Sequence, residues 1–105
     1  MIKRICNKLV RDNYIQEIER MGGSCNWEYM DSSSYKKKLD EKLVETINLY
    51  MSSSTLDSLV EIEEVIRAIA DERGVSQVEF QRKRLDLLGE QGGYNNRILL
   101  KDAIY

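Results

Sequence analysis

The stretch STLDSLVEIEEVIRAIADERG, residues 54–74, indicates a helix at the centre of the fold. Ser54 followed three residues later by Asp57 is an acceptable capping box for the start of this helix, and Arg73-Gly74 ends it. The residues of its apolar stripe are Leu59, Val60, Ile62, Val65, Ile66 and Ile69. A stripe of this width is expected of a helix that contacts more than one neighbour.

Two segments that precede residues 54–74 also have helical periodicity. The first begins near Asp12 and ends at Gly22-Gly23. The second follows a cluster of N-cap candidates, residues 31–34, and runs to about Met51. We therefore expect two helices before the central one, separated by a polar crossing.

The last helix has the clearest start. Ser76 is placed as its N-cap, with Glu79 at the third helical position. Val75 and Phe80 are spaced to form a hydrophobic staple across that start. The pattern predicts a helix that runs to about Leu88.

The remainder of the chain predicts a turn at residues 89–94 and then an extended tail, which forms a short strand or docks on the helices. The chain has no proline, the residue that most strongly breaks helices. We therefore expect a single all-α domain over residues 1–105: a bundle of about four helices with short extended N- and C-terminal segments.

The length and composition of the chain limit the number of domains and the classes of partner that the protein can bind. The 105 residues are enough for one small domain. A formal net charge of -2 argues against binding of DNA or RNA through phosphate neutralisation. No apolar run approaches the roughly 18 to 20 residues of a membrane span, and the start lacks a signal-peptide core. We therefore predict a cytoplasmic protein that binds neither nucleic acid nor a membrane.

The chain contains no histidine, and its two cysteines, Cys6 and Cys25, lack metal-site spacing. Zinc sites of the Cys/His type and Ser-His-Asp or Cys-His catalysis are therefore excluded. Any enzymatic activity is expected to use a metal ion held by oxygen ligands. A chain this short buries only about two thirds of its unfolded surface, so association of subunits is an easy way to bury more.

Two glutamates stand at the edge of apolar stripes. Glu45 lies about 40° around its helix from Leu49, and Glu61 has the same relation to Val65. On adjacent antiparallel helices such carboxylates can converge on one Mg²⁺ or Mn²⁺. The alternative is that both are solvated glutamates.

Four segments together resemble the small MazG-like proteins, which are related to phosphoribosyl-ATP pyrophosphohydrolase. These segments are Lys8-Leu9-Val10-Arg11-Asp12, Lys42-Leu43-Val44-Glu45, Glu64-Val65-Ile66 and Gly92-Gly93-Tyr94 with Arg97-Ile98. The resemblance covers nearly the whole chain. It implies an all-α fold, a homodimer or higher homo-oligomer, and a Mg²⁺-dependent nucleoside triphosphate pyrophosphohydrolase activity.

The metal-binding motifs that this resemblance implies are degenerate. The family motif Glu-Glu-x-x-Glu aligns with residues 45–49, where Thr46 and Leu49 replace the second and third acids. The family motif Glu-x-x-Asp aligns with residues 58–61, where Ser58 replaces the first acid and Glu61 the second. Only Glu45 and Glu61 therefore remain as candidate metal ligands, and Mg²⁺ binding is expected to be weakened. No residue is assigned a catalytic role.

Loss of negative charge lowers the repulsion that a phosphorylated ligand would meet in such a site. The candidates for phosphate or nucleotide contact are Lys8, Arg11, Arg84, Arg97 and Tyr94. For the four cations, surface salt bridges are the alternative. Trp27 and Tyr29 could stack on a base, as could Tyr94, although single aromatic residues usually serve packing.

Three functional hypotheses follow. The first is a protein that binds or sequesters a phosphorylated nucleotide or nucleotide-derived signal without turnover. The second is an active Mg²⁺-dependent nucleoside triphosphate pyrophosphohydrolase, in which Glu64 or Glu41 assists the two remaining ligands. The third is a helical protein-interaction module without a small-molecule ligand.

Overall fold

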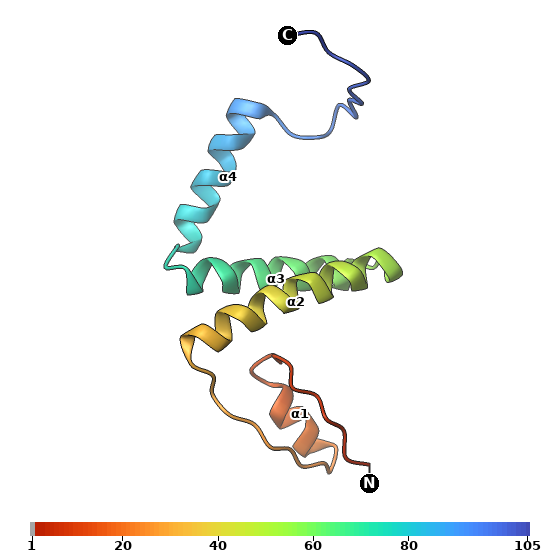
Figure 1. Ribbon diagram of the computed structural model, residues 1–105, viewed down its shortest axis with the longest axis vertical. Helices are drawn as coiled ribbons and strands as arrows, with labels where there is room; N and C mark the ends of the chain where they lie inside the picture. Colours follow the sequence, from red (N-terminus) through yellow and green to blue (C-terminus); the bar gives the residue numbers. More distant parts are fainter. Residues whose placement is uncertain (1) are drawn as a thin grey trace.

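The computed structural model describes residues 2–105, and this part of the chain contains four helices and no strand (Figure 1). The helices are α1 (Tyr14–Arg20), α2 (Ser32–Ser53), α3 (Leu56–Glu72) and α4 (Gln77–Gln91). The prediction of an all-α fold with about four helices is confirmed. None of these helices is both long enough and apolar enough to cross a membrane.

The connection between α2 and α3 is only two residues long, which makes the two helices an antiparallel pair. Ser54 has a φ of 53°, and its N–H donates to the carbonyl of Tyr50 to close α2. Thr55 is the N-cap of α3, and its Oγ1 accepts a hydrogen bond of 3.2 Å from the N–H of Ser58. The predicted capping box of Ser54 with Asp57 is therefore wrong, because Ser54 already serves as the C-cap of α2.

The core of the molecule lies between α2 and α3. Its buried apolar residues are Leu39, Val65 and Ala70. Thr46 and Ser58 are the buried polar residues, and both hydroxyls form hydrogen bonds within their own helical segments. So few buried residues make this a small core for a chain of 105 residues.

The N-terminal part of the chain reaches back to the α2–α3 pair. Lys38 of α2 donates a hydrogen bond of 2.9 Å to the carbonyl of Asn7. The helix α1 begins at Tyr14, two residues after the predicted start, because the N–H of Tyr14 first closes a turn onto the carbonyl of Arg11. It ends before Gly22, whose φ of 83° stops the helix, as predicted.

The fourth helix begins as predicted but continues three residues beyond Leu88. The hydroxyl oxygen of Ser76 accepts a hydrogen bond of 3.1 Å from the N–H of Glu79. The helix passes through Gly89 and ends at Gly92, where φ is 77°. Residues 92–105 form no strand and are exposed throughout, so the expected strand or docked tail is wrong.

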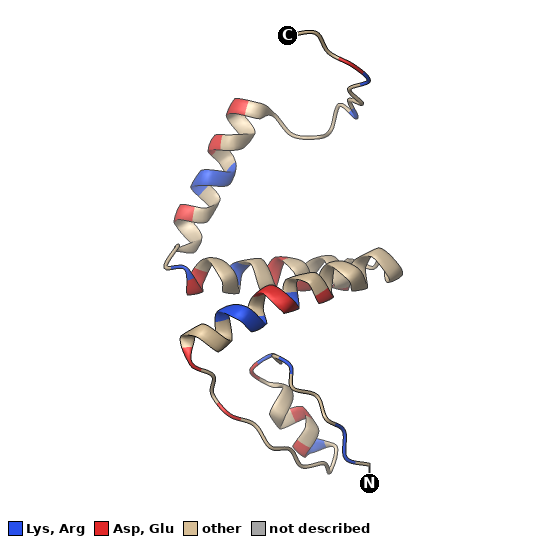
Figure 2. Ribbon diagram, in the orientation of Figure 1, with Lys and Arg blue, Asp and Glu red and all other residues tan. Residues whose placement is uncertain are grey.

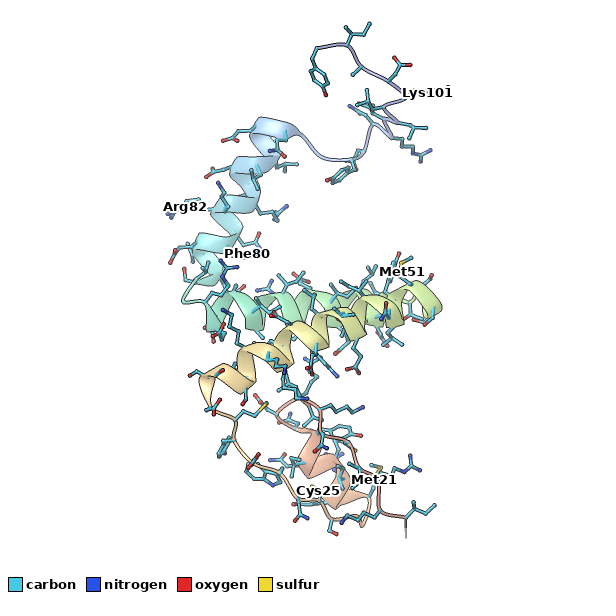
Figure 3. All side chains as sticks on the ribbon, in the orientation of Figure 1. Met21, Cys25, Met51, Phe80, Arg82 and Lys101 are labelled. Carbon is cyan, nitrogen blue, oxygen red and sulfur yellow. The ribbon has the colours of Figure 1, made fainter. Side chains whose placement is uncertain are left out.

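The corner between α3 and α4 is fixed by polar contacts. Arg67 of α3 donates a hydrogen bond of 2.9 Å to Gln77 Oε1, and the side-chain amide of Gln77 donates to the Arg67 carbonyl at 3.4 Å. Beyond Phe80, α4 leaves the α2–α3 pair (Figures 1 and 3). The result is an elongated molecule of 62 × 31 × 23 Å.

Candidate functional site

A groove of about 370 Å³ lies on one face of the α2–α3 pair. It is lined by Lys42, Glu45, Thr46, Asn48, Leu49 and Ser52 of α2 and by Glu61 of α3. The two glutamates that the sequence indicated as metal ligands therefore lie in one groove. Their convergence follows from the helical spacing that places each beside a buried stripe.

Each of these glutamates is paired with a cation of the protein. Lys42 Nζ lies 3.3 Å from Glu45 Oε1, and the Lys42 side chain is only 19% exposed. Arg11, from the segment before α1, donates a hydrogen bond to Glu61 Oε1. The groove therefore contains two carboxylates and the Lys42 ammonium, and the Arg11 guanidinium adds a second positive charge beside Glu61. Figure 2 shows that both signs also occur along the first half of α2.

Three positions at which the resemblance expects acids, two of them in the lining of the groove, cannot supply a carboxylate. Thr46 and Ser58 are buried, and their hydroxyls donate to the carbonyls of Leu43 (3.0 Å) and Thr55 (2.7 Å). Leu49 is half exposed. Across residues 2–105, no group of three or more Asp, Glu or Cys side chains is placed to hold a metal ion. Each cation contacts only Oε1 of its glutamate, so a metal ion at Glu45 or Glu61 would share the carboxylate with that cation.

The neighbouring glutamates of α2 and α3 do not join this pair. Glu41 lies 3.1 Å from Lys38 on its own helix. Glu63 lies 3.1 Å from Arg67, at the next turn of α3. Glu64 is exposed and does not line the groove. The structure thus leaves Glu45 and Glu61 as the carboxylates of the groove.

The predicted phosphate contacts fall into two groups. Arg11 reaches the groove, and Lys8 lies exposed on the same N-terminal segment. Arg84, Arg97 and Tyr94 lie on α4 and the tail, which leave the α2–α3 pair (Figure 1). Within one chain, these three residues are not brought to the groove.

Arg84, Arg97 and Tyr94 form hydrogen bonds with residues close to them in the sequence. Arg84 Nε donates to Gln81 Oε1 at 2.9 Å on the same helix. The Arg97 N–H donates to the Tyr94 carbonyl at 3.1 Å, which forms a turn in the exposed tail. Trp27 and Tyr29, the other aromatic candidates, contact each other edge-to-face with their ring centroids 5.1 Å apart. They lie in the connection before α2 and do not line the groove.

The sequence analysis missed the role of Lys42. This lysine was quoted only as part of a motif, although its spacing of three residues from Glu45 is the spacing of a helical ion pair. The contact between Arg11 and Glu61 joins residues 50 positions apart. No local pattern could have indicated that contact, because it depends on the path of the N-terminal segment.

Two residues near the start of α2 have shifted acid–base properties. The N–H of Ser34 donates to Asp31 and holds the pKa of this N-cap carboxyl below its usual value. Burial raises the pKa of the Tyr35 hydroxyl, and the carboxylates of Asp71, Asp12 and Glu72 add to the effect. The contribution of Asp12 places the N-terminal segment near this end of α2.

Comparison of the chain with protein-family models, curated proteins and solved structures gave no match. The resemblance to the MazG-like proteins therefore rests on the four quoted segments, and it remains a prediction.

Proposed function

We propose that the groove binds the phosphate groups of a nucleotide or nucleotide-derived small molecule without hydrolysing it, in a protein related to the MazG-like pyrophosphohydrolases. The observation that carries this proposal is that both remaining carboxylates already have protein cations as partners: Arg11 for Glu61 and Lys42 for Glu45. A phosphate ligand can be accepted by such a groove without a metal ion.

The charges of the groove residues are the physical reason for proposing metal-free binding of phosphate. Two unit charges 4 Å apart interact by about 1 kcal/mol in water and about 4 kcal/mol at an effective dielectric constant of 20. Five acids in a pocket would therefore exclude a polyphosphate unless metal ions screened them. Here the two acids, Glu45 and Glu61, are matched by two cations, Lys42 and Arg11, so there is no excess of negative charge that would repel a polyphosphate. The guanidinium of Arg11 can also form two parallel hydrogen bonds to a phosphate.

A second candidate function is Mg²⁺-dependent pyrophosphohydrolysis. The observation that favours it is that Glu45 and Glu61 line the same groove. In that case the two carboxylates would hold the metal ion and a water molecule would be the nucleophile. This function requires the metal ion to share the two carboxylates with Arg11 and Lys42, which now contact Oε1 of each.

A thermal-shift screen separates these functions. The full chain is heated with nucleoside triphosphates, dinucleotides and cyclic nucleotides, with Mg²⁺ or with EDTA, and the ligand is then analysed by chromatography. A ligand at 100 times its Kd stabilises the native state by about 2.7 kcal/mol. For a chain of this size, that corresponds to an increase in Tm of roughly 10 to 20 °C.

The proposal expects an increase in Tm in EDTA and recovery of the intact ligand. Arg11→Ala should reduce the shift, whereas Arg20→Ala should not, because Arg20 pairs with Glu17 on α1 outside the groove. A shift that needs Mg²⁺ and yields a monophosphate would establish the hydrolase instead. If no ligand changes Tm, the interaction-module hypothesis is favoured.

A further inference from the structure

A second cavity, here called the end cavity, lies on the α2–α3 pair where α2 begins and α3 ends. Its lining residues are Lys36, Leu39 and Asp40 of α2 and Ile69, Glu72 and Arg73 at the end of α3. The start of α2 and the end of α3 lie at the same end of the pair (Figure 1). The volume of the end cavity is about 340 Å³. This volume lies in the range of about 300 to 1,000 Å³ that is typical of small-molecule sites.

The end cavity and the groove lie on opposite sides of α2. Lys36 and Glu45 point in directions about 180° apart around this helix, as do Asp40 and Leu49. Among residues 2–105, no residue lines both the groove and the end cavity. A ligand in the end cavity therefore does not depend on the phosphate ligand proposed for the groove.

The end cavity contains two cations and two carboxylates that are not paired with each other. Lys36 and Asp40 have the spacing of a helical ion pair. However, none of the five ion pairs within residues 2–105 includes a charged residue of this cavity. On the same helix, by contrast, Lys38 pairs with Glu41 at 3.1 Å. The charged groups of the end cavity are therefore available to a ligand.

The uncharged residues of the end cavity are apolar, and the ends of two helices add partial charges beside it. Leu39 is only 2% exposed, and Ile69 is half-buried. The helix α2 begins at Ser32, about one turn before Lys36, and α3 ends at Glu72. The positive end of the α2 dipole favours an anionic group of a ligand, and the negative end of the α3 dipole favours a cationic group.

We propose that the end cavity binds an α-amino acid with an apolar side chain. The carboxylate of the ligand contacts the two cations, its ammonium group contacts the two carboxylates, and its side chain packs on the two apolar residues. A simple anion would be repelled by both carboxylates, and a simple cation would be repelled by both cations. A small molecule with one charge of each sign gains attraction from all four groups.

Titration of the isotope-labelled full chain with L-leucine and with L-phenylalanine, followed by NMR, tests the proposal. The amide signals of residues 36–40 and 69–73 should shift, whereas those of residues 45–52 should not. Isocaproate is leucine without its amino group, and isoamylamine is leucine without its carboxylate. Each should bind at least about tenfold more weakly than L-leucine, because each lacks one set of charge-assisted contacts.

Two double variants test the carboxylates of the end cavity. Asp40→Asn with Glu72→Gln removes both of them and should raise the Kd of L-leucine at least about tenfold. Glu41→Gln with Asp71→Asn is the matched control, because it makes the same change in charge at adjacent positions of the same helices. Both control residues are exposed and do not line the cavity, so the Kd should be nearly unchanged. The dispersion of the amide signals checks that each variant is folded.

The proposal is overturned if neither amino acid shifts the signals of the end cavity, or if the shifts lie around the groove instead. It is also overturned if isocaproate or isoamylamine binds as tightly as L-leucine, because recognition would then not require both charges. An equal loss of affinity in the two double variants would likewise contradict it, since net charge alone would then explain the effect.

Discussion

Replacing Glu61 with glutamine separates metal-free phosphate binding from metal-dependent hydrolysis. In the structure, Glu61 accepts a hydrogen bond from Arg11 at the edge of the groove. The glutamine variant removes one negative charge and leaves Arg11 free to contact an anion. If the groove binds phosphate without metal, the affinity of the variant for a polyphosphate should therefore increase.

The size of this increase follows from Coulomb's law. Two unit charges about 6 Å apart interact by roughly 0.7 kcal/mol in water and roughly 2.8 kcal/mol at an effective dielectric constant of 20. Because the Glu61 side chain is about one third exposed, we expect a value near the lower end, about 1 kcal/mol. That energy corresponds to a Kd about fivefold lower. The fold should persist, since exposed ion pairs contribute about 0 to 1 kcal/mol to stability.

Isothermal titration calorimetry with inorganic triphosphate in EDTA measures the effect. Glu19→Gln, which makes the same change in charge on α1, should leave the affinity unchanged. A weaker affinity in Glu61→Gln, or binding that appears only with Mg²⁺ and is lost in this variant, would refute the reasoning. The carboxylate would then be acting as a metal ligand.

Three further predictions concern the fold. Thr55→Ala should destabilise the protein by about 1 kcal/mol through loss of the α3 N-cap, and Ser54→Ala by less, as measured by thermal unfolding. Leu39→Ala should cost about 2 to 5 kcal/mol because the core is small, whereas Leu49→Ala in the open groove should change stability by less than about 0.5 kcal/mol. Because the pKa of Tyr35 is raised in the folded state, its neutral hydroxyl contributes stability below pH 10, and this stability is lost as the pH rises through the folded-state pKa. Measurements of unfolding at alkaline pH should show the loss. In Tyr35→Phe, this part of the pH dependence should be absent.

The helix signals that depend on neighbouring residues could be predicted from the sequence. The N-cap at Ser76 lies where the pattern placed it, because its hydrogen bond involves only residues of the same turn. The cap at Ser54 could not be predicted in the same way, since Ser54 and Thr55 are both acceptable N-caps. Tertiary context decides between them: the two-residue connection uses Ser54 to close α2 and leaves Thr55 for α3.

The end of α4 shows how a weak local preference is overridden. Glycine within a helix costs only about 1 kcal/mol, so Gly89 does not stop a helix that is otherwise well formed. Gly92 does stop it, because there the backbone turns to a positive φ. A sequence with glycine at both positions does not indicate which of them is the terminator.

In the groove, too, some features follow from local sequence spacing and others depend on contacts between distant parts of the chain. Angular spacing along the helices correctly brings Glu45 and Glu61 to one groove. The cation beside Glu61 comes from a different part of the chain, so its position depends on the path of the N-terminal segment. The prediction of Arg84 and Arg97 as phosphate contacts carries no information on distance, and α4 takes them away from the groove of their own chain (Figure 1).

Two residues that stand where the resemblance expects acids are integrated into the packing of the helix pair. Thr46 and Ser58 are buried, and their hydroxyl groups form hydrogen bonds within their own helical segments. A carboxylate at either position would be desolvated and would need a new hydrogen-bond or ion-pair partner. Arg11 pairs with Glu61, and Lys42 pairs with Glu45. Thr46→Glu alone would therefore add a buried charge without creating a metal site. Each carboxylate of the groove is paired with one protein cation. A phosphate group is also negatively charged, and for this reason we expect it to compete with the carboxylates for these cations.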